Sequence, residues 1–127
     1  MDKKSGRILC TAFSNGKKHD FKLFRDSRTR IHPDIKSVTD SGYLGINKLH
    51  ANAALPKKRS KKHPLTRQDK AANRDLSSFR ALNENVIGSL KRFKIIADKY
   101  RSRRKRFALR FNLIAGIYNF ELECFYV

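Results

Sequence analysis

The sequence contains few acidic residues, few cysteines and prolines, and no tryptophan. Its 127 residues include two cysteines, three prolines and eleven Asp and Glu residues. Cys10 and Cys124 match no metal-ligand spacing and make no disulfide framework, so we expect two reduced, partly buried thiols. The N-terminus lacks the apolar region of a signal peptide, and no apolar run reaches the ~18 residues of a membrane span. These absences predict a cytoplasmic, reducing environment.

Basic residues are in large excess. Thirty Lys and Arg residues against eleven Asp and Glu residues give a formal net charge of +19. Such a charge repels itself unless a polyanion neutralises it, and nucleic acid is the partner that this composition predicts. An anionic membrane surface is the competing interpretation, and RNA-packing proteins share the composition.

The first half of the chain predicts both strands and a helix. Residues 7–13 are β-prone and bounded by turn signals, which is typical of a strand. Within residues 19–27, Phe21 and Phe24 are spaced for one buried face of a short helix. Residues 35–39 predict a second short strand that ends just before a glycine-containing turn. Strands and helices together indicate an α/β fold, and we expect one domain across the whole chain.

The second half begins with a basic loop. Residues 56–70 carry seven Lys and Arg residues and two prolines, which predicts a loop that does not pack by itself. Thr66, with Asp69 three residues later, resembles a capping box at the start of a helix. Residues 68–93 then show helical periodicity. Its apolar stripe consists of Phe79, Leu82, Val86, Leu90 and Phe93, while Arg80, Glu84 and Lys91 share a polar face.

The chain ends with a second helical pattern. Residues 91–106 hold nine Lys or Arg residues against one acid, Asp98. Residues 104–119 predict the last helix, and the apolar tail at 120–127 predicts either a short strand or a frayed end. The stripe of this helix consists of Phe107, Phe111, Ile114 and Tyr118, which we interpret as core.

Two acids have the placement of metal ligands. Asp40 stands at the end of a predicted strand, where α/β folds place ligands, and Glu84 lies on a helix away from its apolar stripe. Together they could bind a hard cation such as Mg²⁺, which prefers oxygen ligands and assists phosphodiester cleavage. The alternative is that Asp40 only begins an Asx turn and Glu84 only pairs with Arg80. Spacing alone leaves both interpretations open.

Four blocks in register resemble the DDE transposases of the Harbinger-like and related bacterial insertion-sequence families. Residues 40–46 (Asp-Ser-Gly-Tyr-Leu-Gly-Ile) look like the D-[ST]-G-Y-x-G motif around the second aspartate. Residues 80–93 look like the R-x-x-x-E-x-x-x-G-x-x-K-x-F block around the third acid. Residues 15–21 resemble the G-x-x-H-D segment. Residues 99–101 and 107–119 resemble the tail of such enzymes.

The resemblance implies an RNase H-like fold and metal-dependent DNA cleavage and strand transfer at transposon ends. It implies that Asp40 and Glu84 are the second and third catalytic acids. With Asp20, which matches an acid sometimes counted among the ligands, they would bind Mg²⁺ or Mn²⁺. Asn85 follows Glu84 where many relatives have His, so the surroundings of Glu84 depart from the pattern.

The resemblance also implies that the first catalytic aspartate is missing. In the family this residue lies on a strand well before the G-x-x-H-D segment, and Asp2 is the only earlier acid here. We therefore expect a partial RNase H-like core, truncated at its N-terminus and inactive alone. Its partners would be DNA and either the N-terminal half of the same transposase or a second copy of the chain.

The basic runs are the predicted DNA contacts, against the alternative of a merely solvated charged face. A non-catalytic basic nucleic-acid-binding module is the alternative function. His19 could assist Asp20 as a ligand or only begin a helix, whereas His32, His50 and His63 predict surface or loop positions. The predicted DNA-binding residues are Lys57, Lys58, Arg59, Lys61, Lys62, Lys91, Arg101, Arg103 and Arg104.

Overall fold

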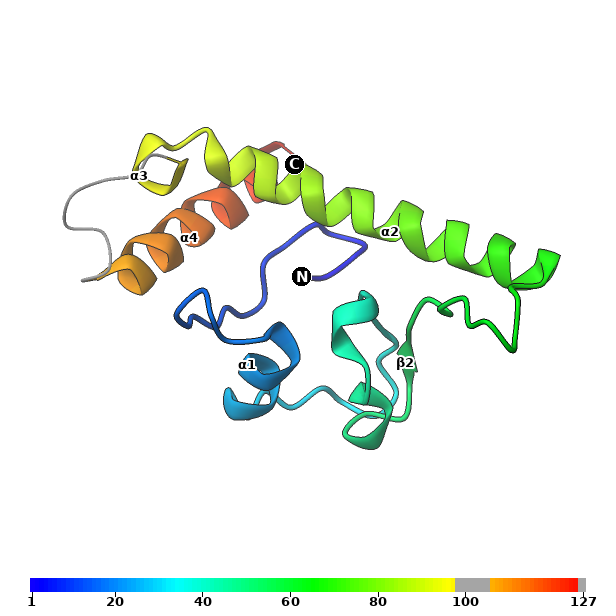
Figure 1. Cartoon of the computed structure of the whole chain (residues 1–127). Coiled ribbons are helices and arrows are strands. Elements are labelled where there is room, and N and C mark those ends of the chain that lie inside the picture. Colours follow the sequence, from blue (N-terminus) through cyan, green and yellow to red (C-terminus); the bar gives the residue numbers. More distant parts are fainter. Residues whose placement is uncertain (98–105, 126–127) are drawn as a thin grey trace. The chain divides into compact units, whose positions relative to one another are not determined.

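The computed structural model describes residues 1–97 and 106–125. The chain forms two compact units (Figure 1). We call Met1–Phe13 with Ala81–Val127 the helical unit, and Ser14–Arg80 the mixed unit. The boundary falls within one long helix, and each unit is described by itself below. None of the helices in the described ranges is long and apolar enough to cross a membrane.

The mixed unit combines short helices with a minimal sheet. Its elements in chain order are helix α1 (Asp20–Asp26), strand β1 (Ser37–Val38), the 3-10 turns η1 (Ser41–Tyr43) and η2 (Ile46–Lys48), and strand β2 (Ala53–Ala54). The two strands are parallel neighbours. The fold is therefore a mixture of helix and small sheet, as the α/β prediction requires at that level. The RNase H-like architecture stays a prediction.

The sheet has two residues in each strand. Ser37 lies opposite Ala53, and Val38 lies opposite Ala54. The predicted strand at 35–39 is thus present in shorter form. Its partner β2 comes from a stretch that had no clear sequence pattern. A sheet of this size leaves most of the extended backbone without a strand neighbour, so other groups must satisfy it.

Helix α1 packs against η1 and begins at a histidine. The ring Nδ1 of His19 accepts the backbone N–H of Phe21 at 3.3 Å, which caps the first turn. This confirms the predicted helix and favours the simpler role of His19. Gly45 has a φ of 98°, and a Cβ there would lie 3.5 Å from the ring of Phe21. A glycine at this position therefore permits the turn beneath the helix.

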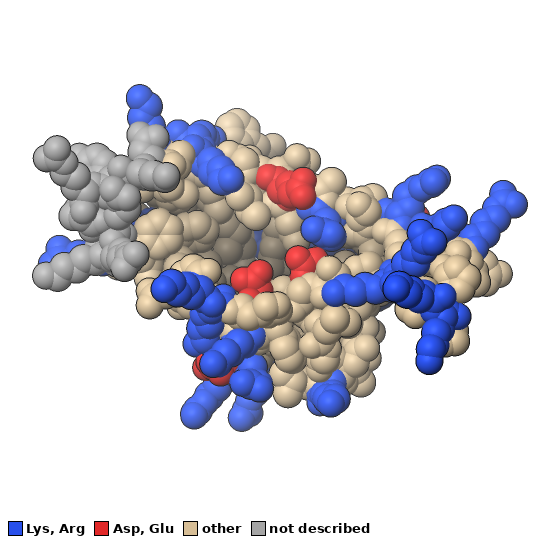
Figure 2. All heavy atoms as spheres, viewed as in Figure 1, with Lys and Arg blue, Asp and Glu red and all other residues tan. Residues whose placement is uncertain are grey.

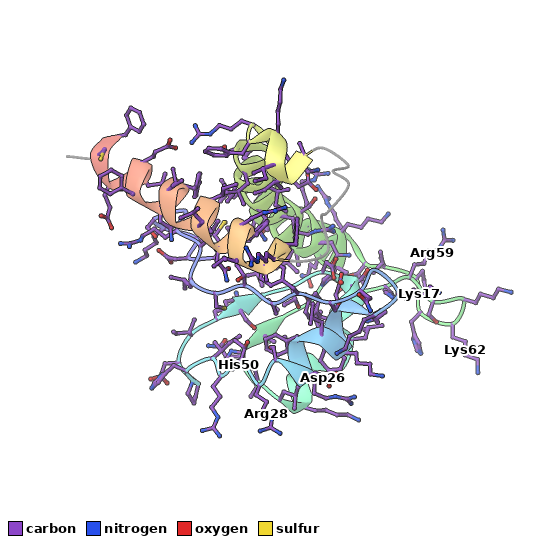
Figure 3. The ribbon with its side chains drawn as sticks, turned by 90° about the vertical axis from the view of Figure 1, so that its left-hand side faces the viewer. Lys17, Asp26, Arg28, His50, Arg59 and Lys62 are labelled. Atoms are coloured by element: carbon purple, nitrogen blue, oxygen red, sulfur yellow. The ribbon has the colours of Figure 1, made fainter. Side chains whose placement is uncertain are left out.

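The centre of the mixed unit contains one apolar and one polar side chain. Ile46 is only 1% exposed. His50 is also buried, and its Nε2 lies 2.7 Å from the carbonyl oxygen of Ile35 (Figure 3). His50 lies in a loop, which is one of the two predicted positions, and its side chain is buried there. The ring is tolerated inside because it hydrogen-bonds the backbone just before β1.

Helix α2 (Arg67–Lys91) starts at the predicted capping box. The backbone N–H of Thr66 donates to Asp69 Oδ2 at 3.2 Å, and the N–H of Asp69 donates to Thr66 Oγ1 at 3.1 Å. These reciprocal bonds satisfy two donors that a helix start leaves open. The predicted helix at 68–93 is confirmed to within about two residues, the usual uncertainty of helix ends.

The helical unit gathers the second half of α2, α3 (Lys94–Ala97) and α4 (Phe107–Phe125). Short helix α3, which the sequence analysis missed, packs against α4. Of the two predicted stripes, Val86, Leu90 and Ile114 are buried, together with Ala115. Leu82 is an exception at 41% exposed. Two of the five residues of the first stripe are therefore buried, and Phe79 and Phe93 are half-buried.

Helix α4 also carries an aromatic cluster. Phe13 meets Phe107 and Phe111 edge to face, with ring centroids 5.9 and 5.4 Å apart. This geometry is favourable beyond the area that it buries, and it confirms the core interpretation of these rings. The helix continues to Phe125, so the alternative of a terminal strand is wrong for the described part of the tail.

Residues 7–13 are not a strand, which corrects the sequence prediction. The backbone N–H of Ile8 donates to Asn119 Oδ1 at 2.9 Å, and Asn119 Nδ2 donates to the carbonyl of Ile8 at 2.8 Å. Arg7 pairs with Glu123 at 2.9 Å. A side-chain amide from α4 thus replaces the strand neighbour that the β-prone sequence suggests, because no described strand lies beside this segment.

The prediction of two partly buried thiols is wrong. Cys10 and Cys124 are free cysteines, and both are exposed rather than partly buried. Cys10 follows directly on the extended stretch that Asn119 holds, and Cys124 lies in the last turn of α4.

We predict that Asn119→Ala destabilises the helical unit. The substitution removes both hydrogen bonds to the half-buried backbone of Ile8 and leaves its N–H and C=O without a partner. The free energy of unfolding, measured by urea denaturation, should fall by about 1–2 kcal/mol.

Asn83→Ala is the matched control for that measurement. Asn83 is exposed on α2 and makes no side-chain hydrogen bond to a described residue, while the gain in helix propensity is the same. Equal stability of the two variants would show that the amide of Asn119 does not hold the segment.

Candidate metal and nucleic-acid site

Asp40 lies directly after β1 and begins η1. Its Oδ1 accepts the backbone N–H of Gly42 at 2.8 Å, so the carboxylate closes an Asx turn. A Cβ on Gly42 would stand 3.0 Å from that oxygen, so the glycine lets the carboxylate approach. The turn that the sequence analysis offered as an alternative role is therefore present. It also fixes the orientation of the carboxylate, since one of its oxygens is held by the backbone.

Asp20 is brought towards Asp40 by an aromatic cluster. Phe21 and Phe24 on α1 both meet Tyr43 of η1 edge to face, with centroids 6.4 and 6.2 Å apart. These contacts fasten the helix that begins at Asp20 onto the turn that begins at Asp40. Asp20 itself is exposed and Asp40 is half-buried.

The pKa of the Tyr43 phenol depends on its burial and on both carboxylates. Burial raises the pKa of Tyr43 above its ordinary value, and the negative charges of Asp20 and Asp40 raise it further. The mixed unit thus contains two of the three predicted metal ligands, on the helix and the turn that the ring contacts of Tyr43 join.

The candidate ligands are among the described acids that form no ion pair with Lys or Arg, as are Asp2, Asp34 and Asp75. Among the described residues, neither Asp20, Asp40 nor Glu84 makes an ion pair with Lys or Arg. Four other acids do: Asp26, Asp69, Glu121 and Glu123 bind Lys18, Lys57, Arg92 and Arg7. The suggested pair of Glu84 with Arg80 is not formed. In a chain with so many cations, these three carboxylates remain open to an added cation.

Glu84 belongs to the helical unit and is exposed on α2. Arg80 and Lys91 are exposed as well, which confirms the predicted polar face, while Val86 and Leu90 turn to the core. Within residues 1–97 and 106–125, no group of three or more His, Cys, Asp or Glu side chains is placed to hold a metal ion. Of the three predicted ligands, Asp20 and Asp40 belong to the mixed unit and Glu84 belongs to the helical unit.

The basic loop before α2 carries most of the predicted DNA-binding residues that the structure describes. Lys58, Arg59, Lys61 and Lys62 are exposed, and in Figure 3 Arg59 and Lys62 extend away from the ribbon. Figure 2 shows Lys and Arg side chains crowded where α2 begins. Lys91 is exposed near the end of α2. Three further predicted contacts, Arg101, Arg103 and Arg104, lie outside the described residues.

The mixed unit has further exposed cations that were not predicted as DNA contacts. They include Lys17, Lys22, Arg25, Arg28, Arg67, Lys70 and Arg74. Those on α2 recur at helical spacing directly after the basic loop, and this periodicity is the signal that could have revealed them.

These observations define a basic α/β protein with unpaired carboxylates. Residues 1–120 match the family described as Transposase DDE domain. A probable transposase for insertion sequence element IS702 from Microchaete diplosiphon is 42% identical over 122 residues. The alignment covers 96% of this chain and 44% of the relative, so the chain spans less than half of that protein's length. No solved structure matches the chain.

The chain belongs to the transposase DDE domain family. This confirms the resemblance to insertion-sequence DDE transposases, while its Harbinger-like part has no support from these relatives. The match runs through all three acids, because it extends from the N-terminus past Glu84.

We predict that the titration of Tyr43 reports both carboxylates. The tyrosinate absorbance that is lost in Tyr43→Phe should belong to a group with a pKa above the ordinary 10.0. Asp20→Asn and Asp40→Asn should each lower this pKa, because removing a nearby negative charge favours the phenolate. Asp75→Asn, an equal charge change elsewhere on the mixed unit, should leave it unchanged.

The sign of the effect on stability follows from the raised pKa. As pH rises past 10.0, the phenol ionises first in the unfolded chain, so the folded state loses stability until the folded pKa is passed. Tyr43→Phe should lack this part of the alkaline loss. If Asp40→Asn leaves the Tyr43 titration in place, the two side chains are not neighbours.

Proposed function

We propose that this chain contributes carboxylates and a DNA-binding surface to metal-dependent DNA cleavage and strand transfer at transposon ends. The proposal is supported above all by the family match, and also by the ring contacts with Tyr43 that fasten the helix beginning at Asp20 onto the turn beginning at Asp40. Acting on DNA would place the protein in the cytoplasm, on the nucleoid in a prokaryote.

A divalent cation fits the donors that are present. Transposase DDE domains generally use divalent metal ions. The donors here are carboxylate oxygens, which suit Mg²⁺ or Mn²⁺ and not a metal that prefers sulfur or nitrogen. When bound, such a cation would activate a water molecule and stabilise the leaving oxygen of a phosphodiester.

Asp40 has the best defined role in this proposal. Its Oδ1 is occupied by the N–H of Gly42, and no described group hydrogen-bonds its Oδ2. The Asx turn therefore orients the carboxylate so that Oδ2 can serve as a ligand. A fixed ligand loses less freedom on binding than a mobile one, so the turn and the metal role support each other.

Asp20 and Glu84 complete the proposed ligand set with less geometric support. Asp20 is placed by α1 and the aromatic contacts, whereas the role of Glu84 rests on its position in the R-x-x-x-E block. Two or three carboxylates are few for a stable site, because Mg²⁺ and Mn²⁺ prefer octahedral coordination. We propose that the remainder of a longer transposase or a second copy of the chain supplies a further acid, so that this chain alone is inactive.

The alternative of a non-catalytic basic module is less favoured. It would account for the charge of +19, but it gives no reason for the unpaired acids at Asp20 and Asp40 or for the family match. A protein that only binds phosphates would be expected to pair or lack acids beside its cations.

We predict that Asp40→Asn separates the turn from the metal site. Asparagine keeps an oxygen for the N–H of Gly42, so the free energy of unfolding should change by no more than about 0.5 kcal/mol. It removes the charge, so the affinity for Mn²⁺, measured by paramagnetic resonance, should fall by about tenfold. DNA binding should be kept or increased, because a negative charge is lost.

Asp75→Asn is the matched control for Mn²⁺ binding. Asp75 is an exposed acid of α2 that makes no ion pair with a described residue, and its substitution changes the net charge equally. If wild type, Asp40→Asn and Asp75→Asn bind Mn²⁺ equally, Asp40 is only a turn residue and the metal role proposed for it is wrong.

A further inference from the structure

The basic loop is fastened to α2 by an asparagine. The backbone N–H of Lys57 donates to Asn73 Oδ1 at 2.9 Å, and Asn73 Nδ2 donates to the carbonyl of Lys57 at 2.9 Å. One side-chain amide thus bonds both backbone groups of the residue at which the loop begins. The other end of the loop is fixed by the capping box of Thr66 and Asp69. The loop is therefore held at both ends.

The side chain of Lys57 is engaged inside this arrangement. Its Nζ donates to Asp69 Oδ1 at 2.6 Å, and the Asp69 side chain is only 18% exposed. The pKa of the Asp69 carboxyl is lowered by the hydrogen bond from Lys57 and by those from Thr66. The Asp69 carboxylate thus stays charged and remains paired with the ammonium group of Lys57. Lys57, predicted as a DNA contact from its sequence, is already paired.

Three basic residues in the first turns of α2 do not form such an ion pair with a described residue. Asp69 and Asn73 are four residues apart and share the face of α2 that receives the loop. Arg67, Lys70 and Arg74 recur at i, i+3 and i+7 on an adjacent face, and all three are exposed. They are spaced by about 4.5 and 6 Å along the helix axis. None of them makes an ion pair with a described residue.

The charge of this region has one sign. Between residues 56 and 74, Asp69 is the only acid, and Lys57 compensates it. The same stretch contains no Phe, Tyr or Trp, so it offers no ring on which a base could stack. A surface with many cations and no stacking side chain fits the phosphate backbone and not the bases.

We propose that the basic loop and the adjacent face of α2 form a single surface for the DNA phosphate backbone, in which Lys57 and Asn73 position the loop and do not contact phosphate. This rests on the proposed action on DNA and adds which residues contact it. The proposed phosphate contacts are Lys58, Arg59, Lys61, Lys62, Arg67, Lys70 and Arg74.

The salt dependence of DNA binding tests the two kinds of lysine. Each lost phosphate contact lowers the slope of log affinity against log salt concentration by about 0.9 on duplex DNA. Lys61→Met should therefore lower the slope by about 0.9 and weaken binding several-fold. Lys57→Met removes the same charge and keeps a similar stem, yet it should leave the slope unchanged.

Proteolysis tests the positioning role independently. Asn73→Ala should speed cleavage after Lys58, Arg59, Lys61 or Lys62 by a protease specific for basic residues, and Lys57→Met should do so to a smaller extent. Asn83→Ala on the same helix should leave the cleavage rate at the wild-type value. Circular dichroism of all variants shows whether any of them fails to form α2. If Asn73→Ala fails to do so, the cleavage rate of Lys57→Met tests the proposal, because this substitution lies outside the helix.

The outcomes separate this inference from the proposed function. If Lys57→Met lowers the slope as much as Lys61→Met, Lys57 is a phosphate contact and the inference is overturned. Equal cleavage of Asn73→Ala and Asn83→Ala overturns it as well. If the wild-type chain shows no salt-dependent binding to DNA, the proposed function itself fails, whatever the loop variants do. A changed slope in Lys61→Met but not in Lys57→Met supports both.

Discussion

Each unit depends on one asparagine that bonds both backbone groups of an extended residue. Asn119 holds Ile8 in the helical unit, and Asn73 holds Lys57 in the mixed unit. The reason is that the described sheet has only two residues in each strand, so most extended backbone has no strand neighbour. A carboxamide offers one acceptor and two donors and can replace a neighbouring peptide. In both cases a helix supplies the missing partner.

Local signals in the sequence predicted local structure well. The capping box at Thr66 and the short helix after His19 depend on residues within one turn of each other, and both are present. The strand predicted at residues 7–13 is absent because a strand forms only beside a second strand. The β propensity of a segment does not show whether such a neighbouring strand exists. The burial of His50 in its loop was not predictable either, since it depends on the carbonyl of Ile35, fifteen residues away.

The candidate site was predictable to the extent that motifs define it. Asp40 and Asp20 were found from their blocks, but only the structure shows the contacts of Phe21 and Phe24 with Tyr43, which fasten the helix of Asp20 onto the turn of Asp40. Which basic residues are available for DNA could not be predicted from the motifs. The composition counts all lysines as free cations, whereas Lys57 forms an ion pair with Asp69 and the neighbouring lysines form none with a described residue. Whether a cation is available depends on pairing, which only the three-dimensional structure shows.

The lack of ion pairs at Asp20 and Asp40 is one physical argument for the site, although Asp2 and Asp75 also form none with a described residue. An exposed ion pair contributes little to stability, so one missing pair would mean nothing by itself. Yet Lys18 pairs with Asp26 at 2.7 Å, while Asp20, two residues from Lys18, has no partner among the described residues. The charges of Asp20 and Asp40 both act on the phenol of Tyr43, and the ring contacts of Phe21 and Phe24 with Tyr43 fasten the helix that begins at Asp20 onto the turn that begins at Asp40. A cation that bound both carboxylates would neutralise two charges that have no ion-pair partner among the described residues.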